Sequence, residues 1–233
     1  MIDTTFFEKL RQGIRPRALA FGSSNTQRFL SGMHWFDCFE LATAETFGLG
    51  ARCINSGVGG DTAQMLLDRF EEEAALFKPH LTFVTVGGNN SKPELGISTE
   101  LFREDLLKLH TKLTALGSSV VLQTYYAPNP TLVWPLERFL EHMETVRGVA
   151  EETGSDLIDH LSRWIPFRDQ YRDVYQSLML DGFHINRFGN MLMGLEIACH
   201  FGLQVGGDAP DLWEPIRSYQ AMMDNAAGTS AGG

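Results

Sequence analysis

Residues 81–90 of this chain read LTFVTVGGNN, a run of apolar and β-branched residues that ends in two glycines and two asparagines. A short apolar run bounded by glycine is typical of a strand buried on both faces of a parallel sheet. Polar residues directly after such a strand lie at its carboxyl end, where parallel sheets bind their ligands. The segment therefore predicts both a sheet and the edge at which a functional site should be sought.

The same pattern recurs on both sides of this segment. Further strands are predicted at residues 17–21 (RALAF), 52–55 (RCIN), 120–125 (VVLQTY) and 156–159 (DLID). Apolar residues at helical spacing predict helices over 66–77, behind a cap at Asp61 and Gln64, and over 102–116, 136–150 and 188–201. This alternation predicts an α/β fold, a three-layer α/β/α doubly wound (flavodoxin-like) domain with about five parallel strands. We expect one domain over residues 1–224 and a disordered tail over residues 225–233.

Composition narrows the class of protein. The 233 residues are 43% hydrophobic and 21% charged, without the roughly 18 to 20 consecutive apolar residues that a membrane span needs. The 19 basic and 29 acidic residues give a net charge of −10, and the basic ones are scattered, so neither nucleic acid nor a membrane is expected as a partner. Three cysteines without a Cys-x-x-Cys pair argue against disulfides and structural zinc. With no signal peptide visible, we expect a cytoplasmic protein; a homo-oligomer stays open.

Reactive residue types follow the predicted strands. Ser23 and Ser24 follow the first strand, the glycine-rich stretch 55–62 (NSGVGGDT) follows the second, and Asp181 and His184 precede the last helix. A hydroxyl, backbone donors, a carboxamide and an Asp-His pair are the groups that acyl transfer needs. A serine hydroxyl is a poor nucleophile at neutral pH, so a histidine must take its proton, and an aspartate can orient that histidine. We expect no cofactor and no metal, because the spacing of Asp181, His184 and His34 does not demand a metal ion.

Other interpretations of the same letters fit less well. GVGGDT has Thr62 where the last glycine of the dinucleotide fingerprint belongs, and no Gly-Lys-Ser/Thr occurs, so nucleotide binding is a minor alternative. The nucleophile elbow G-x-S-x-G fails because Thr26 stands at its final glycine, which disfavours the α/β-hydrolase fold. Each glycine turn, taken singly, is also consistent with a tight connection and nothing more.

The combination of these segments resembles the SGNH (or GDSL) hydrolase family from about residue 17 to residue 203. Block I of that family, usually Gly-Asp-Ser, is similar to residues 22–24, and the resemblance implies that Ser24 is the nucleophile. Block II, Asn-x-Gly-x-x-Gly, matches Asn55, Gly57 and Gly60, and Gly57 is similar to the glycine of the oxyanion hole.

The two remaining blocks complete the predicted site. Block III, Gly-x-Asn-Asp, is similar to residues 87–90 and implies that Asn89 donates to the oxyanion, together with the N–H groups of Ser24 and Gly57. Block V, Asp-x-x-His, is met by Asp181 and His184, which implies a Ser-His-Asp triad.

The chain departs from the family pattern at two positions. Ser23 replaces the usual aspartate beside the nucleophile, and Asn90 replaces the aspartate that ends block III. We hypothesise that the two positions form one polar network that has been neutralised as a unit.

The substrate is the least constrained part of the prediction. The resemblance is strongest to acetylesterases that act on carbohydrates, which predicts hydrolysis of a small acyl ester, an acetyl ester above all, on a carbohydrate. Aromatic residues after strand ends could face a sugar, although each is equally consistent with packing: Trp35, Tyr125, Tyr126 and Trp134, with His34 beside them. The alternatives are a lipid or thioester acylhydrolase of the same family and a non-catalytic carbohydrate-binding protein with a decayed site.

Overall fold

The structure, a computed structural model, describes residues 4–129 and 135–230. Within them, five strands form one sheet: β1 (Arg17–Gly22), β2 (Arg52–Gly57), β3 (Leu81–Thr85), β4 (Ser119–Gln123) and β5 (Asp156–Ile158). All neighbours pair in parallel, in the order β2-β1-β3-β4-β5. This is the flavodoxin-like order, in which the winding direction reverses between β1 and β3. The predicted doubly wound α/β fold with five parallel strands is confirmed.

The chain divides into two compact units. The first comprises Met1–Arg28, Ala51–Tyr125 and Leu132–Ile158, and it holds the sheet. The second comprises Phe29–Gly50, Tyr126–Thr131 and Asp159–Gly233. The expectation of one domain over residues 1–224 stays a prediction.

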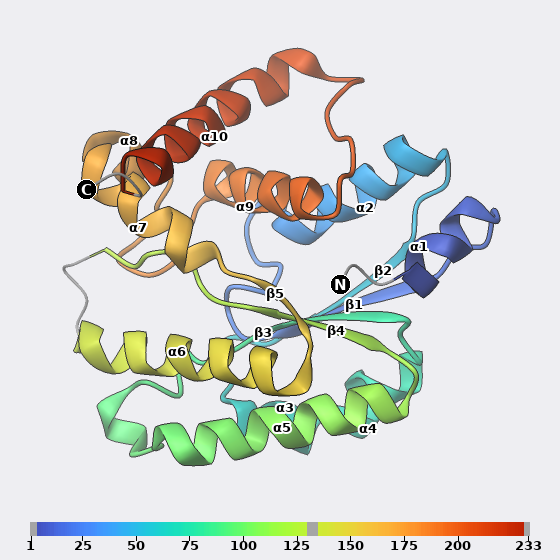
Figure 1. Ribbon diagram of the computed structural model, residues 1–233, viewed down its shortest axis with the longest axis vertical. Coiled ribbons are helices and arrows are strands. Elements are labelled where there is room, and N and C mark those ends of the chain that lie inside the picture. Colours follow the sequence, from blue (N-terminus) through green and yellow to red (C-terminus); the bar gives the residue numbers. More distant parts are fainter. Residues whose placement is uncertain (1–3, 130–134, 231–233) are drawn as a thin grey trace. The chain divides into compact units, whose positions relative to one another are not determined.

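The helices of the first unit include those predicted over 102–116 and 136–150. The unit's helices are α1 (Thr4–Arg11), α3 (Ala63–Asp68), α4 (Phe70–Glu73), α5 (Thr99–Ala115) and α6 (Leu136–Thr153), with the 3-10 turns η1 (Ala75–Phe77) and η2 (Pro93–Leu95). Helices α5 and α6 pack on β4 and on each other, and α3 packs on α5 (Figure 1). The α5 stripe of Phe102, Leu106, Leu109 and Leu113 is buried, as a helix covering a sheet requires.

One predicted helix is broken in the structure. The apolar residues between 66 and 77 indicate a single helix, but α3 ends at Asp68, α4 covers one turn and η1 follows. The break falls at Arg69, whose side chain donates to carbonyls at the ends of β1 and β2 and to the carboxylate of Asp61 in the loop after β2. The N-cap of α3 is Thr62, which accepts from Met65 N–H, rather than Asp61.

The second unit consists of helices and the segments that join them. They are α2 (Trp35–Phe47), α7 (His160–Gln170), α8 (Arg172–Ser177), α9 (Arg187–His200) and α10 (Pro210–Ser230). Helix α2 packs on α9, and α10 packs on α7 and α9. Among residues 4–129 and 135–230, no helix is long and apolar enough to cross a membrane.

The C-terminal segment differs from the expected disordered tail. Helix α10 continues to Ser230, five residues beyond Asn225. Ile216, Met223 and Ala226 are fully buried along this helix, so packing stabilises a segment whose small and polar residues predict disorder when taken alone.

Candidate functional site

The turn after β1 holds the two adjacent serines in different environments. Ser23 is almost fully buried, and its Oγ lies 2.7 Å from the hydroxyl of Tyr125. Its carbonyl accepts the N–H groups of Thr26 and Gln27, both at 2.9 Å, which closes the turn. Ser24 in the middle of this turn is half-buried. Of the two serines, Ser24 is therefore the one that a substrate can reach.

Burial raises the pKa of Tyr125 to about 12, although the bonds with Ser23 and the Gly88 backbone lower it. The phenol thus stays protonated at neutral pH and serves as a hydrogen-bonding partner of Ser23.

The loop after β2 engages the N–H of Gly57, a predicted oxyanion donor. Its N–H donates to Asn55 Oδ1 at 3.0 Å, so this donor is already used inside the loop. Asn55 Nδ2 donates in turn to the Thr26 carbonyl at 2.7 Å, which ties the loop to the serine turn. A Cβ at Gly57 would lie 2.2 Å from Gln27 N. Gly57 therefore permits close backbone packing, and in this structure its N–H already has a partner.

Gly60, three residues later, has the properties expected of a backbone N–H that donates to an oxyanion. Gly60 has a left-handed φ of +91°, open space around its Cα and an exposed backbone. No hydrogen bond between residues in the part of the chain that the structure describes uses its N–H. The sequence signal for it was the final glycine of block II.

We expect Gly57→Ala to lower the free energy of unfolding by about 1–3 kcal/mol, because the new methyl group overlaps the backbone of residues 26 and 27. Urea denaturation measures the change. Gly148→Ala is the matched control: Gly148 lies inside α6 with nothing within 4 Å of its added Cβ, so this change should be stabilising. Equal stability of the two variants would contradict the proposed close packing.

The turn after β3 buries both asparagines of block III. Asn89 is 8% exposed and its Nδ2 donates to the Asp61 carbonyl at 2.9 Å. Because an amide nitrogen carries two hydrogens, this bond orients Asn89 and leaves one hydrogen to donate. Asn90 is fully buried, and its Oδ1 accepts Ala63 N–H at 3.2 Å. No hydrogen bond between described residues joins Asn90 to Ser23, so the hypothesis of one shared network receives no support from the structure.

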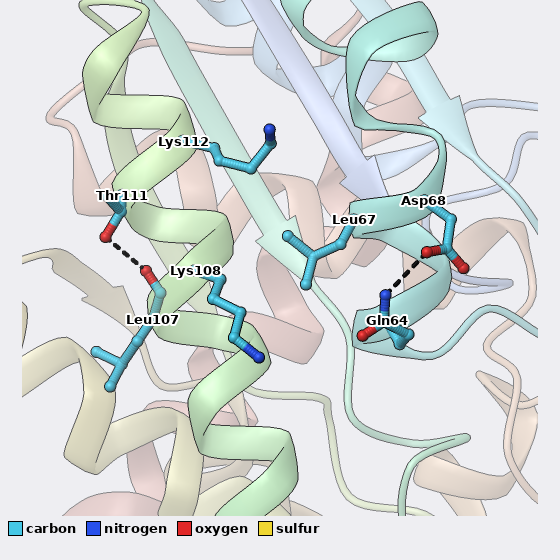
Figure 2. A pocket seen from close by; sticks show the side chains of 7 residues that line it. All are labelled: Gln64, Leu67, Asp68, Leu107, Lys108, Thr111 and Lys112. Atoms are coloured by element: carbon cyan, nitrogen blue, oxygen red, sulfur yellow. Dashed lines mark hydrogen bonds between the residues drawn. The ribbon is translucent and has the colours of Figure 1, made fainter.

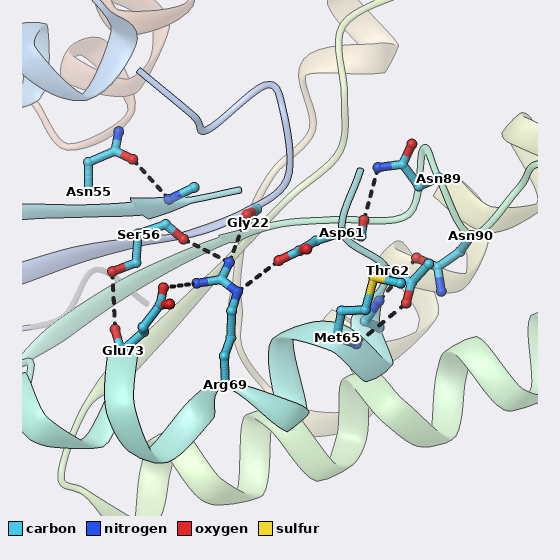
Figure 3. Close-up of polar contacts among 12 residues, drawn as sticks. Gly22, Asn55, Ser56, Asp61, Thr62, Met65, Arg69, Glu73, Asn89 and Asn90 are labelled. Carbon is cyan, nitrogen blue, oxygen red and sulfur yellow. Dashed lines mark hydrogen bonds and ion pairs between the residues drawn. The ribbon is translucent and has the colours of Figure 1, made fainter. Parts of the chain in front are cut away.

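A residue that the sequence analysis did not single out ties these loops together. The Arg69 guanidinium donates to the carbonyls of Gly22 (3.1 Å) and Ser56 (2.8 Å) at the ends of β1 and β2 (Figure 3). It also pairs with the carboxylates of Asp61 (2.7 Å) and Glu73 (2.5 Å) and lies over the Phe21 ring. Since the Asp61 carbonyl accepts from Asn89, Arg69 links the end of β1, where the turn of Ser23 and Ser24 begins, to this asparagine.

The second unit holds the Asp-His pair in a tight loop before α9. Asp181 Oδ2 lies 2.8 Å from His184 Nδ1, and Oδ1 accepts the N–H groups of Phe183 and His184, both at 2.7 Å. Partial burial raises the pKa of Asp181, but these hydrogen bonds outweigh it and the net shift is downward. An ionised carboxylate can only accept a hydrogen bond, so in the neutral form of the imidazole the proton lies on Nδ1 and the lone pair on Nε2.

The hydroxyl of Tyr126 holds this loop through two hydrogen bonds to its backbone. It donates to the Phe183 carbonyl at 2.6 Å and accepts Ile185 N–H at 3.1 Å, on either side of His184. Tyr126 is 1% exposed. Its role is therefore to hold the histidine loop, and no face of its ring is open to a sugar.

Two other aromatic residues that the sequence analysis considered as sugar-facing are also buried. Trp35 and Tyr125 are at most 1% exposed and belong to the core, so the packing interpretation applies to both. His34 caps α2, where its Nδ1 accepts Phe36 N–H. Trp134 lies outside the described residues.

An exposed aromatic ring does lie beside the Asp-His pair. Phe29 is 50% exposed and contacts the His184 imidazole edge-on, with ring centroids 6.1 Å apart.

A pocket of about 670 Å³ between α3 and α5 contains none of the predicted site residues (Figure 2). Its polar side chains pair with one another or with neighbouring acids: Gln64 with Asp68, Lys108 with Asp105 and Lys112 with Glu71. Within the described ranges, no group of three or more His, Cys, Asp or Glu side chains is arranged to hold a metal ion.

Comparisons with known proteins agree with the predicted fold and with the predicted family. The profile of the GDSL-like lipase/acylhydrolase family matches residues 20–192. An acetylxylan esterase of Geobacillus stearothermophilus is 23% identical over 166 residues, which cover 67% of this chain and 74% of that protein.

Solved structures share the fold at similar identity. A lipase/acylhydrolase from Enterococcus faecalis has a TM-score of 0.66 at 23% identity, covering 82% of this chain and 98% of its own. The acetylxylan esterase Axe2 from Geobacillus stearothermophilus has a TM-score of 0.69 at 20% identity, covering 81% and 95%. With more than half of the sequence matched by the family profile, this chain belongs to the GDSL-like lipase/acylhydrolase family and is a carboxylic ester hydrolase.

Proposed function

We propose that this protein is a serine esterase that removes a small acyl group, an acetyl group above all, from a carbohydrate ester. The observation that carries the proposal is the Asp181-His184 pair, whose geometry leaves a lone pair on Nε2 to act as a base. The half-buried Ser24, in a turn closed by the Ser23 carbonyl, supplies the hydroxyl. The mechanism requires Ser24 Oγ and His184 Nε2 to come within hydrogen-bonding reach in the catalytic state.

In the first step, Ser24 Oγ attacks the ester carbonyl while its proton passes to His184 Nε2. Asp181 stabilises the resulting imidazolium and keeps its own charge. The carbonyl oxygen becomes an oxyanion, which accepts from Asn89 Nδ2 and from the backbone N–H groups of Ser24 and Gly60. Collapse of the intermediate breaks the bond to the alcohol oxygen, which takes the proton from Nε2 and leaves an acyl-serine.

Water then releases the acyl group by the same path. His184 removes a proton from the water molecule as its oxygen attacks the acyl-serine, and the second tetrahedral intermediate uses the same three donors. Ser24 leaves with the proton returned from His184. The products are the free alcohol and a carboxylic acid.

The support for a carbohydrate substrate comes from the relatives. Two of the matched proteins are acetylxylan esterases, and another is a lipase/acylhydrolase. The exposed Phe29 ring beside His184 suits the apolar face of a sugar ring as well as it suits an acyl chain. The acyl-chain series below separates these two alternatives.

The test combines active-site labelling with substrate profiling. A fluorophosphonate should modify Ser24, as mapped by peptide mass spectrometry, and modification should disappear in His184→Ala. The wild-type protein should release acetate from acetylated xylo-oligosaccharides faster than it cleaves butyryl or octanoyl esters of the same alcohol. Preference for octanoyl esters would favour a lipid acylhydrolase, labelling of Ser23 would move the nucleophile by one residue, and no labelling would favour a non-catalytic binding protein.

A further inference from the structure

The second unit contains a small pocket directly beside the Asp-His loop. Its volume is about 220 Å³, and its lining comes from two segments: Leu30 and Ser31 on one side, and Asn186, Arg187 and Phe188 on the other. Both segments lead to the imidazole, since Leu30 follows Phe29, whose ring meets His184, and Asn186 comes two residues after His184. The lining therefore begins one residue after the ring that contacts His184 and two residues after His184 itself.

Arg187 lines this pocket as an exposed residue, and it has no acidic partner within residues 4–129 and 135–230. Its aliphatic stem lies against Gly32, where an added Cβ would be 3.2 Å from Arg187 Cβ, and Gly32 has a φ of +109° that favours glycine. Its guanidinium lies over the Phe188 ring, 4.7 Å from the centroid. Among the described residues it forms no ion pair and no hydrogen bond. Packing, rather than a carboxylate, orients this cation.

Arg187 is the one charged residue that the structure describes in the lining of this pocket, and the nearby polar groups of Asp181 and Asn186 already have partners. Both oxygens of Asp181, the acid nearest in sequence, are used by Phe183 and His184. Asn186 Oδ1 accepts Phe188 N–H, and Asn186 Nδ2 donates to the Ser177 carbonyl, so this amide is also occupied. The Ser31 hydroxyl has no partner in the described part of the chain. The pocket thus presents two exposed donors, a guanidinium and a hydroxyl, together with the apolar side chains of Leu30 and Phe188.

We propose that this pocket is a subsite for a carboxylate carried on the substrate, so that the enzyme prefers esters whose alcohol part is anionic, such as an acetylated sugar linked to a uronic acid. A planar carboxylate can accept two parallel hydrogen bonds from a guanidinium, and the walls pack against its carbon skeleton. The protein carries a net charge of −10, so anions are repelled in general, and a local unpaired cation gives this one position the opposite preference. The inference rests on the proposed function, because it places the pocket beside the base of that reaction.

The kinetic test compares two esters that differ in one charge, 4-acetoxybenzoate and its methyl ester. The ratio of their kcat/KM values should fall about tenfold in Arg187→Gln, because a charge-assisted pair is lost for the anion alone. Arg187→Lys should retain part of the preference, since the charge stays but the paired donors are lost. Arg52→Gln is the matched control: Arg52 is exposed at the amino end of β2, and its loss changes the net charge equally without changing the ratio. An unchanged ratio in Arg187→Gln, or an equal fall in Arg52→Gln, would overturn the subsite.

A binding measurement separates this inference from the proposed reaction. In Ser24→Ala, NMR titration should show that 4-methoxybenzoate binds more tightly than methyl 4-methoxybenzoate, and Arg187→Gln added to that variant should abolish the difference. Anion-selective binding without Ser24-dependent hydrolysis would keep the subsite and refute the esterase. Hydrolysis without anion-selective binding would refute the subsite alone.

Discussion

Replacing His184 with alanine is expected to lower kcat for acetyl ester hydrolysis by about 10⁴- to 10⁶-fold. Without the imidazole, nothing in the proposed mechanism removes the Ser24 proton during attack or returns a proton to the leaving alcohol. The residual rate should be that provided by substrate binding and the oxyanion donors. Steady-state kinetics with an acetylated xylo-oligosaccharide measures the loss.

Two further variants make this result specific. Asp181→Asn should lower kcat by about 10⁴-fold, because an amide cannot hold the same tautomer or stabilise the imidazolium. His110→Ala removes a half-buried histidine from α5 and should leave kcat within twofold. If His184→Ala kept more than a tenth of the wild-type rate, the assignment of His184 as the base would fail.

Asn89→Ala is expected to lower kcat by about 100- to 1,000-fold, or roughly 3 to 4 kcal/mol of transition-state stabilisation. The remaining amide hydrogen of Asn89 would meet the oxyanion, which exists only after Ser24 attacks. Loss of this donor should therefore appear in kcat and leave KM almost unchanged. Kinetics over a range of substrate concentrations separates the two parameters.

Loss of stability alone would not mimic this result. Asn89→Ala also removes the bond to the Asp61 carbonyl, which should cost about 1 kcal/mol of unfolding free energy. That cost is measured by urea denaturation and is too small to reduce the folded fraction of a typical domain noticeably. A fall in kcat below fivefold would remove Asn89 from the mechanism.

The role of each block II glycine depended on tertiary contacts. The spacing of Asn55, Gly57 and Gly60 singles out the loop, but a motif does not say which N–H is already used. The Asn55 side chain occupies the Gly57 donor, and the packing of Gln27 explains the missing side chain there. The aromatic residues follow the same logic, because Tyr125 and Tyr126 follow a strand in sequence yet are fully buried.

The periodicity and order of the sequence determined the parallel sheet, its doubly wound class and the residues at its carboxyl edge. These depend on local patterns: buried strands are apolar, and turns need glycine. Only the tertiary structure decided that Arg69 breaks a predicted helix to bind Gly22, Ser56 and Asp61, and that α10 continues past Asn225. Both features depend on partners 8 or more residues away in the chain. These partners are backbone carbonyls that need a donor in the first case and an apolar surface in the second, and the spacing of neighbouring residues does not reveal them.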